Sequence, residues 1–231
     1  MKKQILLFLF IMISLSAYSQ FGKNPIINLE NMDEKTIQWG YYLGFNTYDF
    51  RFDYKENVAR DIKVDPTTGF NVGLIGDLRL NSFFNLRFEP GLSSNTRFMY
   101  YPEINNPVQS KREVQSTYIY MPLLLKISTL RSGNIRPFIT TGLSTAINLS
   151  SNHDSSEDNS NGKFRMVRMP SFYELGFGID LYLEYFKFTP SIRGIFGIQD
   201  ELIRDQNPDS PWTGNIEKMT SRGIFINFTF Q

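Results

Sequence analysis

Residues 171–181 have the sequence SFYELGFGIDL, whose side chains alternate in character from Tyr173 onward. One set of side chains is apolar and consists of Tyr173, Leu175, Phe177, Ile179 and Leu181. The intervening set is charged or lacks a side chain, and it consists of Glu174, Gly176, Gly178 and Asp180. A period of two is typical of a β-strand whose two faces meet different surroundings. The stretch therefore predicts a strand with one apolar and one charged face.

Seven further stretches repeat the alternation, over residues 37–52, 69–80, 84–94, 117–128, 137–149, 186–198 and 221–230. Each is long enough to cross a bilayer as a tilted strand. The connections alternate between short ones, at 81–83, 129–135 and 182–185, and long ones, at 53–68, 95–116, 150–170 and 199–220. Bacterial outer-membrane barrels have short periplasmic turns, long outer loops and no open sheet edge. We predict an all-β fold, an eight-stranded antiparallel transmembrane (outer-membrane) β-barrel with both termini periplasmic.

The polar faces of these strands carry nine charged residues: Asp77, Arg79, Arg87, Glu89, Lys126, Glu174, Asp180, Lys187 and Arg193. A secreted lipocalin-like barrel is the main competing fold, but its ligand-binding interior is apolar. Eight strands enclose a space just wide enough for side chains to fill. Because five of the charges are basic and four acidic, we expect a structural network of ion pairs, with a selective pore as the alternative.

The N-terminus has the features of a secretory signal peptide. A basic start at Lys2 and Lys3 precedes an apolar run over 5–17, and the small residues Ala17 and Ser19 form a small-x-small cleavage motif before Gln20. The apolar run is shorter than the roughly 20 residues of a membrane-spanning helix. We predict a signal peptide over 1–19, a periplasmic N-terminal segment over 20–36 and the barrel over 37–231.

The composition restricts the chemistry that the chain could perform. It has no Cys, one His, 24 Lys+Arg and 23 Asp+Glu, which removes thiol nucleophiles, Cys-based zinc sites and a basic footprint for nucleic acid. The single His153 could ligate a metal with Asp154, Glu157 and Asp158, or serve as the base of a membrane-embedded esterase. We favour a solvated loop and expect no enzyme, cofactor or metal. Aromatic girdles at the membrane boundaries are predicted from Trp39, Tyr41, Tyr100, Tyr101 and Tyr173.

Several stretches resemble the PorT family of Bacteroidetes outer-membrane barrel proteins. The most distinctive is NPIINLENMD at 24–33, and the others are at 40–46, 69–73, 77–80, 84–91, 121–126, 136–138 and 186–193. The resemblance implies a role with the type IX secretion system and, in gliding species, with motility. It brings no active site to carry over. It directs attention to a possible partner-binding segment before the first strand, with Asn24, Pro25, Asn28, Leu29, Met32 and Asp33.

Two functions therefore stand as hypotheses. In the first, the chain is a non-enzymatic accessory or assembly component of a type IX secretion apparatus, with outer-membrane lipid and other components of that apparatus as partners. In the second, it is a stand-alone structural or adhesive barrel that binds ligands through its long outer loops.

Overall fold

The computed structural model describes residues 26–56 and 60–231. The predicted signal peptide at 1–19, together with Asn24 and Pro25, lies outside the described residues. Within them, no helix is long and apolar enough to span a membrane.

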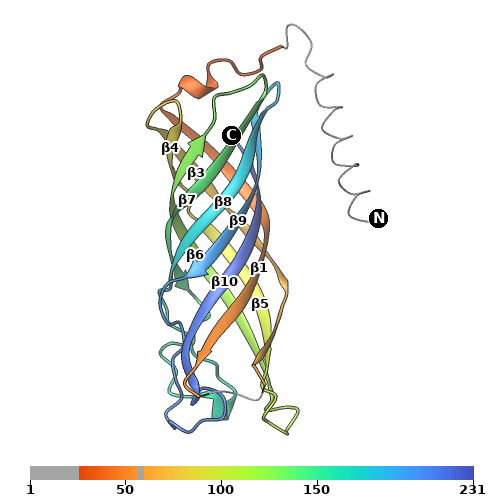
Figure 1. Cartoon of the computed structure of the whole chain (residues 1–231), viewed down its shortest axis with the longest axis vertical. Helices are drawn as coiled ribbons and strands as arrows, with labels where there is room; N and C mark the ends of the chain where they lie inside the picture. Colours follow the sequence, from red (N-terminus) through yellow and green to blue (C-terminus); the bar gives the residue numbers. More distant parts are fainter. Residues whose placement is uncertain (1–25, 57–59) are drawn as a thin grey trace, which may run out of the picture.

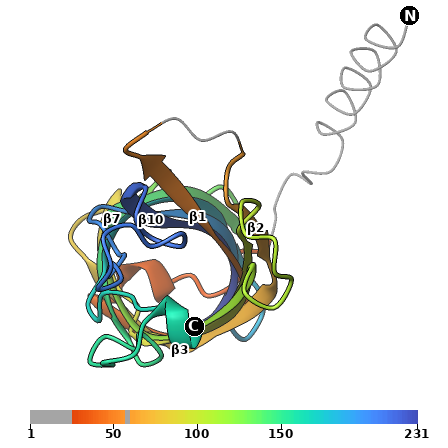
Figure 2. The ribbon, with the colours of Figure 1, turned by 90° about the horizontal axis from the view of Figure 1, so that it is seen from below.

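In the described residues, ten β-strands form one closed antiparallel sheet (Figure 1). Their bounds are β1 Ile37–Tyr54, β2 Lys63–Pro66, β3 Thr68–Arg79, β4 Phe84–Phe88, β5 Gly91–Tyr100, β6 Lys111–Ser128, β7 Ile135–Asn148, β8 Ser171–Tyr182, β9 Lys187–Gly197 and β10 Ile216–Phe230. The described part of the chain also forms two short 3-10 helices outside the sheet, η2 Met32–Glu34 and η3 Asn159–Asn161. The sheet closes because β1 pairs with both β10 and β3, and the ring is visible along the barrel axis in Figure 2.

The ten strands occupy eight positions around the barrel. β4 and β5 lie end to end in one register against β6, and the break between them falls at Glu89 and Pro90, where proline cannot donate a ladder hydrogen bond. β2 and β3 are likewise successive parts of one strand, and both pair with β5. The closed all-β antiparallel barrel predicted from the alternation is confirmed.

Several strands run further than predicted. β1 reaches Tyr54, β5 reaches Tyr100 and β6 begins at Lys111, so the first two long connections shrink to 55–62 and 101–110. The predicted loop bounds were wrong because side chains such as Lys111 and Glu113 face water there. Most outward side chains are no longer apolar in this region, so the alternating pattern ends, while the hydrogen-bonded pairing of the strands continues. We call this end of the barrel, with connections 55–62, 101–110, 149–170 and 198–215, the loop end.

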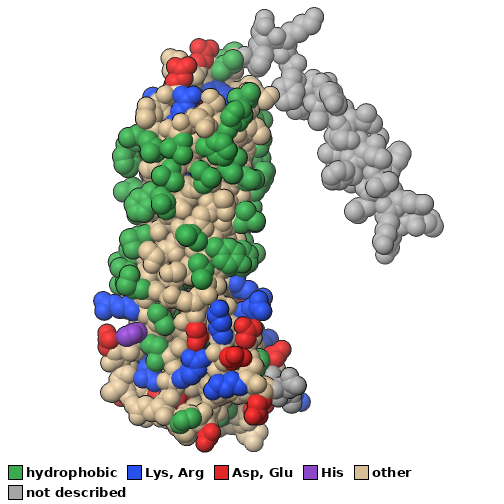
Figure 3. Space-filling model, turned by 60° about the vertical axis from the view of Figure 1, so that its left-hand side comes forward, with side chains coloured by type: hydrophobic (Ala, Val, Ile, Leu, Met, Phe, Trp, Pro, Cys, Tyr) green, Lys and Arg blue, Asp and Glu red, His purple; other side chains and the backbone are tan. Residues whose placement is uncertain are grey.

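The opposite end, which we call the turn end, has the short connections 80–83, 129–134 and 183–186. Between the two ends the outer surface is apolar, as Figure 3 shows for one face. Side chains such as Leu74 and Leu143 are each 63% exposed on the barrel wall. An apolar surface of this extent suits hydrocarbon rather than water.

Inside, the barrel is filled in layers. Near its middle lies an aromatic cluster of Tyr48, Tyr118, Tyr120, Ala146, Phe172, Ile195 and Phe225. At the loop end a second apolar core forms from Phe50, Met99, Tyr101, Val114, Phe164, Met166, Leu202, Ile216 and Met219. Since Phe164, Met166 and Leu202 come from the connections, the longest loops fold over the barrel and contribute to a common core.

Candidate functional site

Buried charges occupy the lumen between the aromatic layer and the turn end. Arg87 on β4 faces Asp77 on β3 across the ladder, and its Nη2 and Nε atoms lie 2.7 and 3.0 Å from Asp77 Oδ2. Asn85 donates to the other carboxylate oxygen at 2.6 Å. The Arg87 and Asp77 side chains are 3% and 1% exposed, so this pair is removed from water.

A chain of charges then crosses the barrel. Arg87 Nη1 lies 3.5 Å from Glu89 Oε1, and Glu89 Oε2 accepts a hydrogen bond from Arg193 Nη1 at 2.8 Å. Arg193 Nε is 3.2 Å from Glu174 Oε2, while Tyr120 donates its hydroxyl to Glu174 Oε1 at 2.6 Å. Because β9 stands opposite the β4–β5 strand in the ring, the contact between Glu89 and Arg193 spans the lumen.

Glycines make space for these long side chains. A Cβ atom on Gly176 would lie 2.8 Å from Cγ of Arg193, its neighbour across the ladder, and 2.7 Å from Oγ1 of Thr140. Both distances are too short for a real contact. The small residues of the charged face therefore allow arginine to reach across the lumen.

A second group of charges lies nearer the turn end. Lys126 on β6 pairs with Asp180 on β8, and Thr189 donates to the same carboxylate at 2.8 Å. Lys187 donates to the side-chain carbonyl of Gln38 at 2.6 Å. Eight of the nine charges expected in the lumen are buried there. The ninth, Arg79, is half-buried at the turn-end mouth and forms no ion pair with any described residue.

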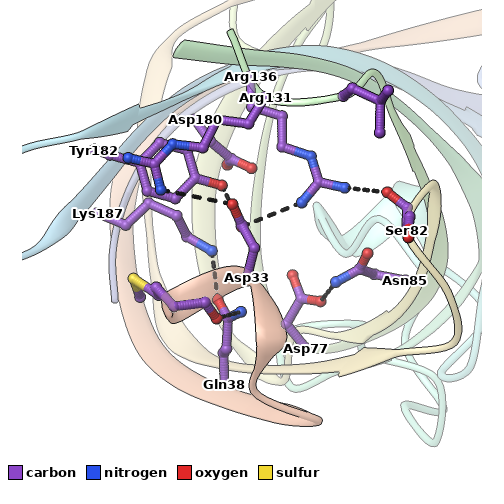
Figure 4. Close-up of polar contacts among 12 residues, drawn as sticks. Asp33, Gln38, Asp77, Ser82, Asn85, Arg131, Arg136, Asp180, Tyr182 and Lys187 are labelled. Carbon is purple, nitrogen blue, oxygen red and sulfur yellow. Dashed lines mark hydrogen bonds and ion pairs between the residues drawn. The ribbon is translucent and has the colours of Figure 1, made fainter. Parts of the chain in front are cut away.

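The segment before β1 is held across the turn-end mouth by Asp33 of η2 (Figure 4). Asp33 Oδ1 accepts hydrogen bonds from Tyr182 at 2.5 Å and from Arg136 at 3.2 Å, and Arg131 lies 3.7 Å from Oδ2. Arg136 also donates to the Ser82 carbonyl at 2.6 Å. One carboxylate thus joins the N-terminal segment to turns and strands far away in sequence.

Further hydrogen bonds fix the segment on both sides of Asp33. The Asn28 backbone N–H donates to Asn134 Oδ1 at 2.9 Å, and the Asn28 side chain donates to the Tyr182 carbonyl at 3.0 Å. Arg131 donates to the Asn28 and Leu29 carbonyls, and Gln38 donates to the Met32 carbonyl. Four of the residues expected to bind a partner, Asn28, Leu29, Met32 and Asp33, therefore contact the barrel itself.

Two fully buried charged side chains at the loop-end side of the lumen escaped the sequence analysis. Arg97 on β5 is fully buried over the Phe50 ring, 3.9 Å from its centroid, and donates to Ser116 and Ser221. The Ser221 hydroxyl donates in turn to Glu201 at 2.7 Å. Arg97 could have been found, because it continues the inward parity of Ser93, but it fell in a stretch expected to be a loop. Glu201 carried no comparable signal.

The candidate metal residues do not converge. His153 Nδ1 lies 2.9 Å from Asp154 Oδ1 on an exposed part of the 149–170 loop. Asp158 instead caps η3, and hydrogen bonds from Ser160 lower the pKa of its carboxyl. The described residues contain no group of three or more His, Asp or Glu side chains placed to hold a metal ion.

The aromatic girdle prediction was wrong at one position. Trp39, Tyr41 and Tyr173 are 73%, 53% and 49% exposed on the barrel wall. Tyr101 is only 3% exposed, because the chain turns inward after β5 and packs this ring into the loop-end core.

A closed barrel with an apolar outer wall and a filled, charged interior defines a β-barrel membrane protein. Residues 18–202 match the family described as "Outer membrane protein beta-barrel domain", and the chain belongs to this family. It is therefore an outer-membrane β-barrel protein in contact with the lipid of that membrane.

No curated protein matches the chain. Among solved structures it is similar to OprG from Pseudomonas aeruginosa, with 12% identity, a TM-score of 0.46, and coverage of 84% of this chain and 93% of that one. It is also similar to Neisserial surface protein A, with 8% identity, a TM-score of 0.45, and coverage of 84% and 98%. Ail of Yersinia pestis, solved with the heparin analogue sucrose octasulfate, has 10% identity, a TM-score of 0.40, and coverage of 85% and 99%. These similarities assign no function to the chain.

Proposed function

We propose that the chain is a non-enzymatic accessory or assembly component of a type IX secretion apparatus, related to the PorT family and, in gliding species, connected with motility. In this proposal both termini and the turn end face the periplasm, and the loop end faces outward. The partners are other components of the same apparatus. The resemblance of the 24–33 stretch to the PorT family is what suggests this apparatus.

One structural observation carries the proposal: the N-terminal segment is fixed across the turn-end mouth through Asp33. A disordered N-terminal segment would not form specific contacts with the barrel. This segment contacts four barrel residues, Arg131, Arg136, Tyr182 and Asn134. A fixed segment presents a defined surface at low entropic cost to a partner. Ile26 and Ile27, 82% and 47% exposed, are the apolar side chains that this surface offers.

The alternative is a stand-alone structural or adhesive barrel. The packing of the loops into a common core favours it, since an ordered platform at the loop end could also recognise ligands. In that case the N-terminal segment would only close the mouth.

The first experiment deletes the chromosomal copy and measures secretion of several unrelated exported proteins. The deletion strain is then complemented with the wild-type chain, with Asp33→Ala, and with the matched control Glu34→Ala, which changes the neighbouring exposed carboxylate. A third variant lacks residues 21–33. Folding of each variant in the membrane is checked by heat-modifiable gel mobility.

We expect secretion to fail in the deletion strain and in the strain with the shortened variant, to fall with Asp33→Ala, and to be normal with Glu34→Ala. Normal secretion in the deletion strain would exclude the type IX role and leave the stand-alone barrel. Full rescue by a folded chain without residues 21–33 would move the partner surface to the loops or the lipid face.

A further inference from the structure

A small cavity lies at the loop end between three connections that are far apart in sequence. Its volume is about 100 Å³, room for one ring-sized group. The 55–62 connection, the 101–110 connection and the 198–215 connection each contribute to its wall. Its principal lining residues are Tyr54, Arg60, Tyr101, Glu103, Trp212 and Asn215.

Three aromatic residues, Tyr54, Tyr101 and Trp212, line the cavity, and contacts with neighbouring groups hold the rings of Tyr54 and Trp212 in place. Trp212 donates its indole N–H to the Gln109 carbonyl at 3.0 Å, and the Arg112 guanidinium lies 5.0 Å from its ring centroid. The Tyr54 hydroxyl accepts a hydrogen bond from the Ile62 backbone at 2.9 Å. Rings fixed in this way offer flat surfaces with little ordering cost.

One buried polar group of a lining residue lacks a hydrogen-bond partner in the described part of the chain. The Tyr101 side chain is almost completely buried, yet its hydroxyl makes no hydrogen bond with any described residue. A buried hydroxyl without a partner costs free energy, so a ligand that pairs with it gains affinity. Burial raises the pKa of Tyr101, which keeps this hydroxyl protonated and able to donate.

The rim adds one charge of each sign. Arg60 and Glu103 are exposed, and neither forms an ion pair with another described residue. Glu103 would repel an anion such as a phosphate, while Arg60 and the nearby Arg112 would repel an organic cation. Together they supply donors and acceptors to a neutral ligand that carries several hydroxyl groups.

We propose that this cavity binds a single neutral pyranose unit of a glycan, with the sugar stacked on Trp212 and its hydroxyls bonded to Arg60 and Glu103. The apolar faces of pyranose rings pack against aromatic rings, and their hydroxyls both donate and accept. This proposal does not depend on the secretion role. If the loop end faces outward, the cavity lies on the cell surface.

The chain offers a direct reporter, because it has only two tryptophans. Trp39 is on the outer wall near the turn end, so Trp39→Phe leaves Trp212 as the single fluorophore. The full chain with this substitution is titrated in detergent with methyl glycosides of glucose, galactose, mannose and N-acetylglucosamine. Inorganic phosphate and choline serve as anionic and cationic probes.

We expect a saturable change in Trp212 fluorescence with at least one neutral glycoside and none with phosphate or choline. Arg60→Gln, Glu103→Gln and Tyr101→Phe should each weaken binding about tenfold, as expected for the loss of one buried or charge-assisted hydrogen bond. Tyr100→Phe is the matched control, because Tyr100 lies on the outer wall beside Lys63 and Lys111, and it should bind as the parent does.

The proposal would be overturned by no saturable response to any neutral glycoside, by binding of phosphate or choline instead, or by cavity variants that all bind with the affinity of the parent chain. Two sources of such a glycan are then compared. Polysaccharide purified from the cells that carry this protein should bind if the unit belongs to their own envelope, and unrelated surface glycans should bind if it is foreign. Failure of the secretion experiment would leave these results unaffected.

Discussion

Arg87 illustrates at the residue scale how the lumen tolerates charge. Its guanidinium contacts the carboxylates of both Asp77 and Glu89 in a region closed to water. Removing the arginine leaves the buried carboxylate of Asp77 without its ion-pair partner, while Glu89 keeps Arg193. Arg87→Ala should therefore lower the free energy of unfolding by about 3 to 5 kcal/mol, measured by urea titration in lipid vesicles.

Arg51→Ala is the control for that prediction. Arg51 also lies on a barrel strand beside a carboxylate, 3.4 Å from Asp53, but the two side chains are 66% and 47% exposed. Exposed pairs contribute about 0 to 1 kcal/mol. Equal losses from both substitutions would show that the lumen pair is no less hydrated than the surface pair.

The buried carboxyl group of Glu201 at the loop end is expected to make the free energy of unfolding depend on pH. Burial raises the pKa of its carboxyl above the ordinary 4.5, although hydrogen bonds from Ser221 oppose the shift. The folded chain therefore binds this proton more tightly than the unfolded chain does. Its contribution to stability is complete below the unfolded pKa and is lost as the pH rises through the folded pKa.

We expect Glu201→Gln to remove part of this decrease in stability above pH 4.5, because glutamine stays neutral. The free energy of unfolding is measured as a function of pH for the wild type, Glu201→Gln and the control Glu217→Gln, which changes an exposed carboxylate on β10. A pH profile that Glu201→Gln leaves unchanged would assign the decrease to other groups.

At the scale of elements, the two kinds of connection predict the orientation of the barrel. Val108 in a loop-end connection and Tyr185 in a turn are both 83% exposed, so a protease-cleavable tag can be inserted beside either one without disturbing a packed side chain. Protease added to intact cells should cut the tag beside Val108 and leave the tag beside Tyr185 intact. Cleavage beside Tyr185 alone would invert the orientation.

At the scale of the whole molecule, the filled lumen predicts that the barrel does not conduct. Three layers of side chains close it within the described residues: charges near the turn end, aromatic rings in the middle and an apolar core under the loops. The purified protein reconstituted in planar bilayers should show no stable conductance. Asp33→Ala should also show no stable conductance, because this substitution releases only the N-terminal segment at the turn-end mouth and leaves the side chains that fill the lumen in place. A steady open channel in the wild type would contradict the filled lumen.

The sequence predicted the wall of the barrel well and its ends poorly. Alternation from Ile37 onward identified every strand position and the inward face that buries Arg87, Glu174 and Arg193. It failed at the loop end, where inward side chains such as Met99 and Val114 are apolar while Glu113 of β6 faces water, and where Tyr101 turned out to be buried. Of the candidate site, the sequence found the residues of the lumen but not which of them meet.

The all-β barrel can be predicted from the sequence alone, because a period of two with one apolar face is a local property of each strand. Only the tertiary structure decided the pairings, because Glu89 meets Arg193, and Asp33 meets Arg136, after closure of the sheet brings distant strands together. The same holds for the cavity at Trp212 and Tyr101, since its walls come from three connections that meet only above a finished barrel. Contacts between residues far apart in sequence produce no periodic pattern along the chain, so they cannot be predicted from it. Both functional proposals depend on such contacts.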